Sequence, residues 1–323
     1  MILGALSFIF GGCCSTAYTL EAIVREYPKS GLLITFSQFV FIAIEGLLYF
    51  LLHNPSALKN PNVPRKRWMC IVFLFFSINV LNNVALGFDV SVPVHIILRS
   101  SGPLTTMSVG WMLANKKYTI LQMISVAVLT IGVVISVLGN TNDIHVHMSS
   151  TTNFTIGFTI LMVTQLLGAF MGLLMEDTYK KYNASWRESL FYTHAFSIPF
   201  FLPLLGSIRK QWMLLFTDSE SSNLVLFGMP PAFWYICLNT LAQYLCVRGV
   251  NSLGSQSSAL TVTIILNIRK FVSLCLSILL FGNRLSGPVV LGACLVFGSS
   301  ATYAYSRPAV KAKTVGKNEK KNT

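Results

Sequence analysis

The stretch 261-TVTIILNIRKFVSLCLSILLF-281 is long enough to cross a bilayer as a helix, yet it carries Arg269 and Lys270 near its middle. Burying one such charge at mid-membrane costs about 2.5 to 3.5 kcal/mol, so a water-filled cavity, an internal counter-ion or an anionic ligand has to offset this cost. Three serines fall on the helical face of the two cations: Ser258, Ser273 and Ser277. We expect a substrate to bind along this face.

The whole chain has the composition of an all-α polytopic membrane protein. Of its 323 residues, 53% are hydrophobic and only 11% are charged. Apolar runs and their breakers predict ten transmembrane helices, at residues 3–22, 31–52, 68–88, 93–114, 119–139, 155–176, 187–206, 228–248, 257–281 and 287–306. The connections between them are too short to hold a soluble domain.

The charge of the chain is distributed as in a membrane protein. A formal net charge of +13 would suggest nucleic-acid binding in a soluble protein. Here most lysines and arginines fall on one side of the membrane if both termini are cytosolic, which is the usual bias of cytosolic loops. We therefore expect cytosolic termini, contact with membrane lipid and no nucleic-acid partner.

Five predicted spans lie on each side of a linker without basic residues, which suits the lumen. An odd number of spans per half predicts two inverted repeats, as in many secondary transporters. The expected domains are a first five-helix repeat at 1–140, a lumenal linker at 141–154, a second five-helix repeat at 155–306 and a basic cytosolic tail at 307–323. Lys320 and Lys321 give this tail a KKxx ending, typical of retrieval to the endoplasmic reticulum by a coat complex; an ordinary basic tail is the alternative.

The sequence gives no indication of an enzyme. It has no paired intramembrane aspartates, no H-E-x-x-H, no nucleophile elbow and no glycine-rich phosphate loop. The seven cysteines lie within or at the edge of predicted spans without C-x-x-C spacing, which we interpret as buried free thiols. We expect no catalytic residue, no metal and no cofactor.

Polar side chains in the other predicted spans suggest what the substrate is. Arg99 lies in HIILRS, and a guanidinium group binds phosphate oxygens bidentately, so Arg99 with Arg269 and Lys270 suits a diphosphate. Amide side chains match the edge of a pyrimidine base, and a tyrosine ring stacks on its face. The candidates for base or sugar contact are Asn82, Asn83, His95, Asn239, Gln243 and Tyr244. Hydrogen bonding between helices is the alternative role of the amides.

A second group of polar residues is expected along the path of the substrate or at its gates. Glu45 is the one carboxylate deep in a predicted span, so it is either protonated or faces a cation such as Arg99, Arg269 or Lys270. Such a pair either holds the bundle together or moves as a gate. The path and gating candidates are Gln38, Glu45, Glu188, Ser273 and Ser277.

Five stretches resemble the nucleotide-sugar transporters of solute carrier family 35, subfamily B: TFSQFVFIAIEG, NNVALGFDVSVPVHIILRS, ESLFYTHA, QYLCVRGV and SALTVTIILNIRKFVSL. The resemblance spans almost the entire chain and is closest to the branch, with yeast members, that carries UDP-N-acetylglucosamine and UDP-xylose. It implies ten helices in the drug/metabolite transporter fold, residence in the endoplasmic reticulum or Golgi, and exchange of cytosolic UDP-sugar for lumenal UMP. It also implies that Arg99, Arg269 and Lys270 meet the phosphates.

Other functions are compatible with the same residues. The chain lacks the FYNN and GALNK motifs of GDP-mannose carriers, which argues against a guanine sugar. The substrate is then UDP-N-acetylglucosamine, another UDP-sugar such as UDP-xylose, or an organic phosphate. In a further alternative the protein is a scaffold or chaperone of the endoplasmic reticulum membrane that transports nothing, and its buried charges form structural ion pairs.

Overall fold

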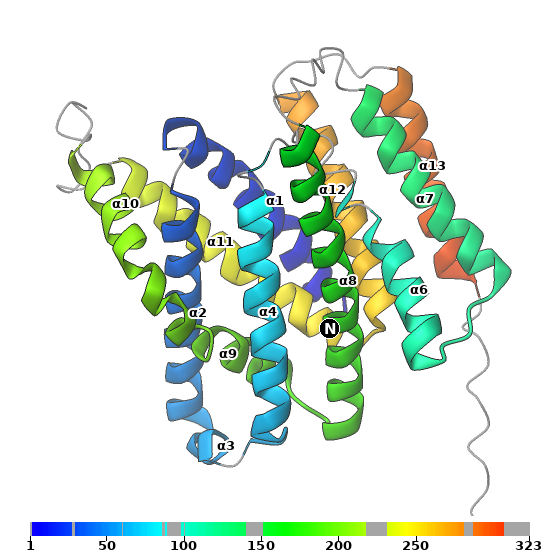
Figure 1. Cartoon of the computed structure of the whole chain (residues 1–323). Coiled ribbons are helices and arrows are strands. Elements are labelled where there is room, and N and C mark those ends of the chain that lie inside the picture. Colours follow the sequence, from blue (N-terminus) through cyan, green and yellow to red (C-terminus); the bar gives the residue numbers. More distant parts are fainter. Residues whose placement is uncertain are drawn as a thin grey trace, which may run out of the picture.

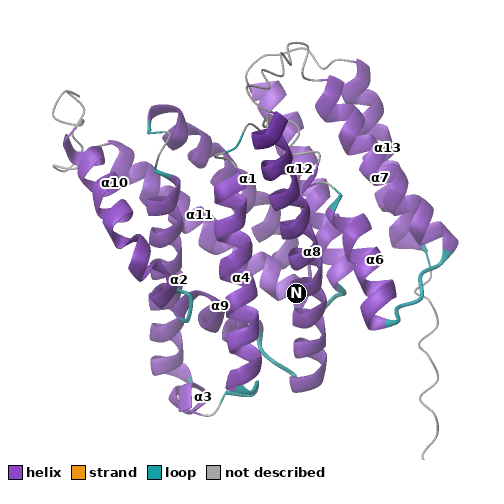
Figure 2. Cartoon of the chain, in the orientation of Figure 1, coloured by secondary structure: helices purple, strands orange, loops and turns teal. Residues whose placement is uncertain are grey.

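The computed structural model describes residues 2–27, 30–59, 61–85, 88, 98–99, 101–139, 151–217, 231–280 and 287–306. All regular structure in these ranges is helical (Figures 1 and 2). In chain order the helices are α1 (Ile2–Glu26), α2 (Gly31–His53), α3 (Pro55–Lys59), α4 (Arg65–Ala85), α6 (Gly102–Ala114), α7 (Ile120–Gly139), α8 (Thr151–Tyr182), α9 (Trp186–Ala195), the 3-10 helix η1 (Ile198–Leu204), α10 (Leu205–Thr217), α11 (Pro231–Gly254), α12 (Ala259–Leu280) and α13 (Gly287–Tyr305).

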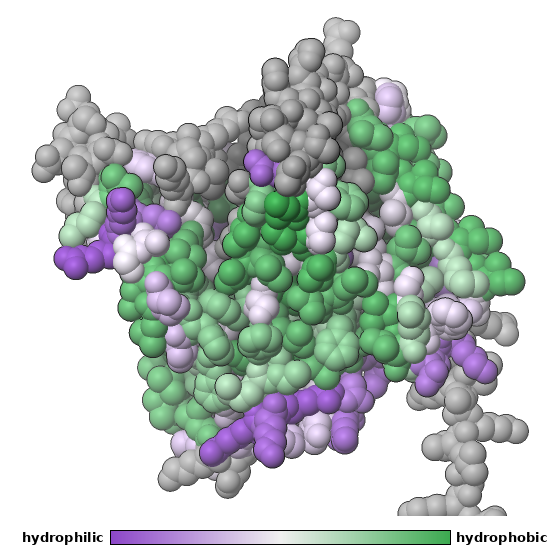
Figure 3. Space-filling view, in the orientation of Figure 1, coloured by the Kyte–Doolittle hydropathy of each residue, from purple (hydrophilic) through white to green (hydrophobic). Residues whose placement is uncertain are grey.

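The helices form a bundle with an apolar outer surface. Four segments among the described residues are long and apolar enough to cross a membrane: Ile2–Leu20, Gly31–His53, Asn153–Tyr182 and Trp186–Leu215. Figure 3 shows a broad hydrophobic band over the helices, with hydrophilic residues gathered below it at the end of the bundle that carries α3. We call this the α3 end. The start of α1 and the end of α13 both lie towards it (Figure 1).

One predicted span is interrupted. Instead of a single helix at 187–206, the chain forms α9, then η1 and then α10, which together cover Trp186–Thr217. Pro199 and Pro203 have no backbone N–H and cannot continue the α-helical hydrogen bonding, so a tighter 3-10 segment joins the two α-helices. The span expected at 155–176 belongs to a longer helix, because α8 continues to Tyr182 at the α3 end.

Helices α1 and α11 are in close backbone contact. A Cβ atom at Gly12 would lie 2.6 Å from the Cys246 backbone nitrogen, and one at Gly249 would lie 2.8 Å from the Ala5 carbonyl oxygen. At this crossing Cys13 and Cys246 form a disulfide, with Cα atoms 4.7 Å apart. Only glycine lets the two backbones approach this closely.

The interpretation of the cysteines as buried free thiols was therefore wrong in two ways. Cys13 and Cys246 are oxidised, although they are 233 residues apart in sequence and no spacing rule connects them. Cys70, Cys237 and Cys294 are free thiols, but they are exposed on the outer surface rather than buried. The side chain of Cys275 is outside the described residues.

Helix α12 is held from one side by a second closely packed pair, α7 and α13. A Cβ atom at Gly132 of α7 would lie 2.8 Å from Leu295 Cβ, so these two helices also cross at a glycine. They lie side by side at the right of Figure 1. Ile264 and Phe271 of α12 pack in the same apolar cluster as Val126 and Val296. This packing fixes the rotation of α12 and hence the direction of its two cations.

Candidate substrate-binding site

Three cations meet where α12 passes the start of α6. Lys270 Nζ donates hydrogen bonds to the Arg99 backbone oxygen at 2.9 Å and to Asn267 Oδ1 at 3.3 Å. Arg269 Nη1 contacts the Cys13 carbonyl oxygen of α1 at 3.4 Å, at the outer limit of a hydrogen bond. Arg99 and Arg269 are close enough to repel each other. The structure thus brings together the three residues that the sequence singled out for phosphate.

The positive charge of this cluster is not neutralised by the described protein. None of the three residues forms an ion pair with a carboxylate in the described ranges. The Arg269 Nε atom is buried and has no hydrogen-bond partner there. Arg99 is exposed and Lys270 is partly exposed, so the described protein does not completely cover either side chain. Unpaired cations within a bundle are costly, and an anionic ligand would remove that cost.

Glu45 does not neutralise the cluster, contrary to one expectation. Its Oε1 atom accepts a hydrogen bond from the Tyr244 hydroxyl at 2.7 Å and lies 3.9 Å from Arg187 Nη1. The Arg187 guanidinium also stacks on the Tyr49 ring, 3.7 Å from its centroid. The cation that faces Glu45 is therefore Arg187 of α9, and this pair lies about two turns along α2 from the end of that helix. This leaves Arg99, Arg269 and Lys270 without that counter-ion.

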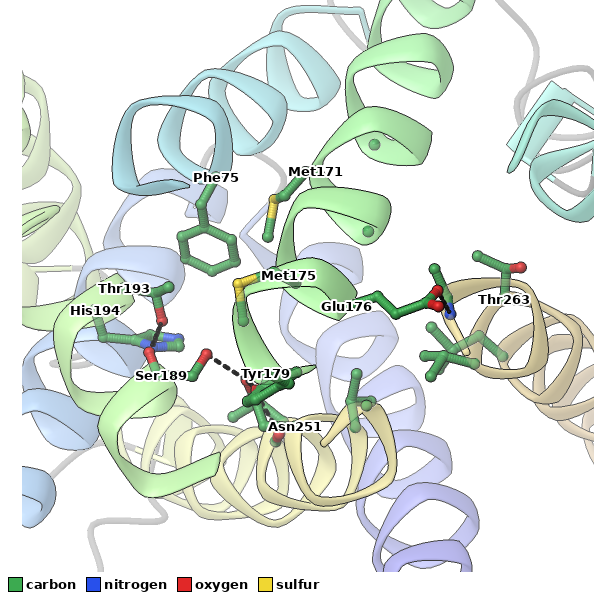
Figure 4. A pocket seen from close by; sticks show the side chains of 18 residues that line it. Phe75, Met171, Met175, Glu176, Tyr179, Ser189, Thr193, His194, Asn251 and Thr263 are labelled. Carbon is green, nitrogen blue, oxygen red and sulfur yellow. Dashed lines mark hydrogen bonds between the residues drawn. The ribbon is translucent and has the colours of Figure 1, made fainter. Parts of the chain in front are cut away.

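A cavity of about 290 Å³ lies beside α12, towards the α3 end from the cations. We call it the central cavity; it is enclosed by α4, α8, α9, α11 and α12 (Figure 4). Val262 and Leu266 line it, and they share a helical face with Lys270 at four-residue spacing. Its volume is at the lower end of the range typical of small-molecule sites. A ligand held by the cations can therefore extend into this space.

The central cavity has a polar wall around Asn251 and an apolar wall opposite it. Asn251 Oδ1 accepts hydrogen bonds from the Tyr179 hydroxyl at 3.2 Å and from the Ser189 hydroxyl at 3.0 Å, and Figure 4 shows these groups meeting from α8, α9 and α11. Opposite them are Phe75 of α4 with Met171 and Met175 of α8. A ring that is apolar on its faces and polar at its edge fits such walls, and the flexible methionines can adapt to it.

Gln38 and Asn239 hold helices together. Asn239 is fully buried; its Nδ2 donates to Thr19 Oγ1 at 2.9 Å and to the Thr16 carbonyl oxygen at 3.1 Å. Its Oδ1 accepts from Gln38 Nε2 at 2.7 Å. These bonds join α1, α2 and α11. Of the two roles considered for Asn239, this conformation shows hydrogen bonding between helices.

The remaining candidates make other contacts or lie outside the described residues, and of these Ser273 is one turn along α12 from Arg269. Asn82 Nδ2 donates to the Ile78 carbonyl oxygen of its own helix at 2.9 Å, and Ser273 Oγ lies 3.0 Å from Cys14 Sγ of α1. Glu188 is buried at the start of α9 and accepts from Trp68 Nε1 at 3.3 Å. Gln243 is partly buried on α11. The predictions for Asn83, His95 and Ser277 lie outside the described side chains.

The residues of the central cavity were not predicted from the sequence. Asn251 follows predicted span 228–248, and Ser189 lies in ESLFYTHA, which carried the resemblance but received no role. A weak signal does exist in α8, where Gly168 and Gly172 alternate with Met171 and Met175 at four-residue spacing. A strip of small residues beside flexible ones on one helical face is compatible with a cavity, although it is also compatible with close packing.

Comparison with known proteins places the chain in a family. A profile of the UAA transporter family matches residues 1–307. The chain belongs to the UAA transporter family. As a UAA transporter it is 63% identical over 319 residues to the UDP-N-acetylglucosamine transporter yea4 of Schizosaccharomyces pombe, covering 99% of this chain and 100% of that protein. The resemblance that the sequence suggested is thereby confirmed.

Two more distant relatives cover nearly the same length. The nucleotide sugar transporter SLC35B4 of Homo sapiens is 33% identical over 309 residues, which are 93% of this chain and 92% of that protein. The endoplasmic reticulum GDP-fucose transporter of Drosophila melanogaster is 35% identical over 320 residues, 94% of this chain and 90% of that protein. A solved crystal structure aligns with a TM-score of 0.64 over 92% of this UAA transporter and 96% of that chain, at 10% identity, which shows a shared fold only.

Proposed function

We propose that this chain carries UDP-N-acetylglucosamine from the cytosol into the lumen of the endoplasmic reticulum or Golgi, in exchange for UMP, by alternating access. The observation that carries the proposal is the cluster of Arg99, Arg269 and Lys270, which has no carboxylate partner among the described residues. A diphosphate supplies the missing negative charge and enough oxygens for two guanidinium forks. The 63% identical relative, named for UDP-N-acetylglucosamine, supports the choice of sugar.

The site geometry suggests how one site serves both directions of exchange. The phosphates of UDP-N-acetylglucosamine bind the three cations, and one end of the ligand enters the central cavity beside Asn251. UMP keeps a phosphate and the same base, so it competes for the same groups from the lumenal side. A carrier that returns only when loaded then couples uptake of the sugar nucleotide to release of UMP. In this proposal the phosphates provide most of the affinity, and the central cavity determines which non-phosphate part of the ligand is accepted.

The proposed topology has ten spans in two inverted repeats, with both termini and the α3 end in the cytosol. Basic residues at the α3 end support this orientation, because cytosolic loops carry an excess of lysine and arginine. Lys116 and Lys117 follow α6, Lys180 and Lys181 end α8, and Arg65 begins α4. Transport requires no bond to be made or broken, which agrees with a family of transporters rather than enzymes.

Ligand-dependent thermal stability of the purified protein tests this function. UDP-N-acetylglucosamine and UMP are expected to raise the unfolding temperature by several degrees, because saturation at about 100 times Kd stabilises by about 2.7 kcal/mol. UDP-xylose, GDP-fucose and free N-acetylglucosamine form the comparison panel. GDP-fucose is included because a 35% identical relative is named for it. A scaffold without a transport site would show no shift with any of these ligands, and a larger shift with GDP-fucose would contradict the uridine assignment.

The KKxx ending predicts where the protein resides. Lys320→Ala with Lys321→Ala is expected to move most of the protein from the endoplasmic reticulum to later compartments, measured by fluorescence microscopy of tagged protein in cells. The matched control is Lys311→Ala with Lys313→Ala, which removes the same charge from the same tail but leaves the last four residues intact. An equal shift with both pairs would favour an ordinary basic tail, and no shift with either would reject retrieval by this signal. The tail lies outside the described residues.

A further inference from the structure

A second, larger cavity opens at the α3 end. Its volume is about 790 Å³, and it lies between the α6–α7 link, the end of α8, the start of α12 and the end of α13. We call it the α3-end cavity. It follows α12 from Ser258 to Ile268, about 15 Å along the helix, so that it reaches the residue before Arg269. Of the residues placed on the cation-bearing helical face only Ser258 lines it, and none of the three cations does so.

The α3-end cavity carries a net positive charge. Lys116 and Lys117 of the α6–α7 link and Lys180 of α8 line it, against the single carboxylate of Glu176. Lys117 forms no ion pair among the described residues. Burial, with Glu176 and Tyr303 nearby, raises the pKa of Tyr118 to about 12, so this phenol adds no negative charge. The cavity therefore attracts an anion.

The link that presents Lys116 has a fixed conformation. Asn115 ends α6 in the left-handed region with φ of 47°, and the Lys116 N–H donates to the Gly110 carbonyl oxygen at 3.0 Å. A left-handed residue directly after the last helical turn stops the helix and turns the chain. A Cβ atom at Gly110 would collide with the Tyr118 hydroxyl, so the tyrosine ring would have to shift if the glycine were replaced. Lys116 is thus held at the cavity rather than free to turn into solvent.

Glu176 separates the α3-end cavity from the central cavity, because it lines both. Its side chain is 5% exposed and accepts hydrogen bonds from Lys116 Nζ at 2.6 Å, from Lys180 Nζ, and from the Ala259 backbone N–H at 2.7 Å. Figure 4 shows Glu176 directed away from the polar wall of the central cavity and towards α12. One carboxylate thus joins the α6–α7 link, α8 and α12 at the boundary between the two cavities.

We propose that the α3-end cavity is an encounter site for a phosphate-bearing anion. The anion binds Lys116 and Lys180 in place of Glu176, and the loss of these two ion pairs opens the boundary to the central cavity. The proposal rests on the proposed function and assigns the anion to the entering nucleotide sugar. A diphosphate has more charge and more acceptor oxygens than a carboxylate, so it competes for both lysines. Glu176 then loses its two cations, and a buried carboxylate without them is unstable where it is.

The exchange provides a reason for ligand-dependent opening. In the closed state the two lysines are occupied by Glu176, and in the open state they are free for phosphate. A phosphate-bearing ligand therefore binds the open state more tightly and shifts the population towards it. A solute without phosphate has no such differential affinity and leaves the boundary closed. The headgroup of an anionic lipid also carries a phosphate, so the test has to distinguish a nucleotide sugar from a lipid as the bound anion.

Binding of inorganic pyrophosphate to purified protein in neutral detergent, measured by calorimetry, tests the site. Lys116→Gln with Lys180→Gln is expected to weaken binding about tenfold, whereas Glu176→Gln, which frees both lysines, is expected to tighten it about fivefold. Asp177→Asn is the matched control for Glu176, because its partner is Arg67 and it lines neither cavity. Lys181→Gln is the control for Lys180 on the same grounds. Both controls are expected to stay within about twofold of the wild type.

The opposite signs distinguish an exchange site from a structural ion pair. If the network only held helices together, Glu176→Gln and the lysine changes would weaken binding alike, and that result would overturn the proposal. If Glu176→Gln does not fold, the test compares the pyrophosphate affinity of Lys180→Gln with that of its control Lys181→Gln. Lys180 is 69% exposed, so its replacement does not threaten folding. Equal affinities of these two variants would also overturn it.

Transport assays separate this proposal from the proposed function and from lipid binding. In vesicles of phosphatidylcholine alone, Lys116→Gln with Lys180→Gln is expected to raise the KM for UDP-N-acetylglucosamine about tenfold with little change in maximal rate. An effect on KM that appears only after phosphatidic acid is added would overturn the assignment to nucleotide sugar in favour of a lipid headgroup. Pyrophosphate binding that still depends on Lys180 in Arg269→Ala protein would show that the encounter site exists even if the proposed transport were wrong.

Discussion

Arg269→Ala is expected to lower uptake of UDP-N-acetylglucosamine into proteoliposomes by about 100-fold or more, because a charge-assisted bidentate contact to phosphate is worth about 1.5 to 3 kcal/mol and the neighbouring cations act with it. Arg269→Lys keeps the charge but loses the planar fork, so an intermediate rate is expected. The variants remain folded, because in the described structure the Arg269 side chain makes only one weak hydrogen bond. Initial uptake rates from radiolabelled substrate provide the measurement.

The matched control is Arg209→Ala on α10. Arg209 is an exposed cation on a helix that does not contribute to either cavity. Its removal is expected to leave uptake within about twofold of the wild type. If Arg269→Ala protein transported at the wild-type rate, or were stabilised by UMP as strongly as the wild type, the phosphate role of this cluster would be excluded.

Gly12→Ala is expected to lower the unfolding temperature of the purified protein by at least about 5 °C, or to prevent its accumulation. The added Cβ would lie 2.6 Å from the Cys246 backbone nitrogen and 2.9 Å from the Ala242 carbonyl oxygen. Both neighbours are helix backbone and cannot rotate away, so α1 and α11 have to separate. Unfolding monitored by intrinsic fluorescence, together with the yield of monodisperse protein, measures the effect.

Gly11→Ala provides an internal control of the same chemistry. Gly11 is the preceding residue of α1, and a Cβ atom there meets nothing within 4 Å. Alanine is also the better helix former, so a neutral or slightly stabilising effect is expected. Equal destabilisation by the two changes would mean that helix propensity or the lipid environment, rather than contact with α11, makes glycine necessary.

The position of α12 and the residues of the cation cluster were predictable, because both follow from local composition. The span at 257–281 corresponds to α12 at Ala259–Leu280. A long apolar run in a bilayer forms a helix because a helix satisfies all its backbone hydrogen bonds within the segment. Arg99, Arg269 and Lys270 were singled out individually by the cost of charge inside such runs. Their proximity depends on the tertiary structure, but it is expected if all three side chains bind the same anion.

What the sequence did not show depends on contacts between distant segments. Arg187 as the partner of Glu45, and Cys13 as the partner of Cys246, are fixed by how helices rotate and cross. The break before α10 does not follow from hydropathy, because Pro199 and Pro203 lie within one continuous apolar run. Glu176 is the last residue of the predicted span 155–176, and only the extension of α8 to Tyr182 places it between two cavities.

The Cys13–Cys246 disulfide has a consequence for the motion of the protein. One cysteine belongs to the first half of the chain and the other to the second, so in the oxidised form the two halves cannot swing apart at this crossing. Together with the glycine contacts, the disulfide makes α1 and α11 one rigid unit. Helices elsewhere would have to tilt about it, and the reduced protein would gain a freedom of movement that the oxidised one lacks.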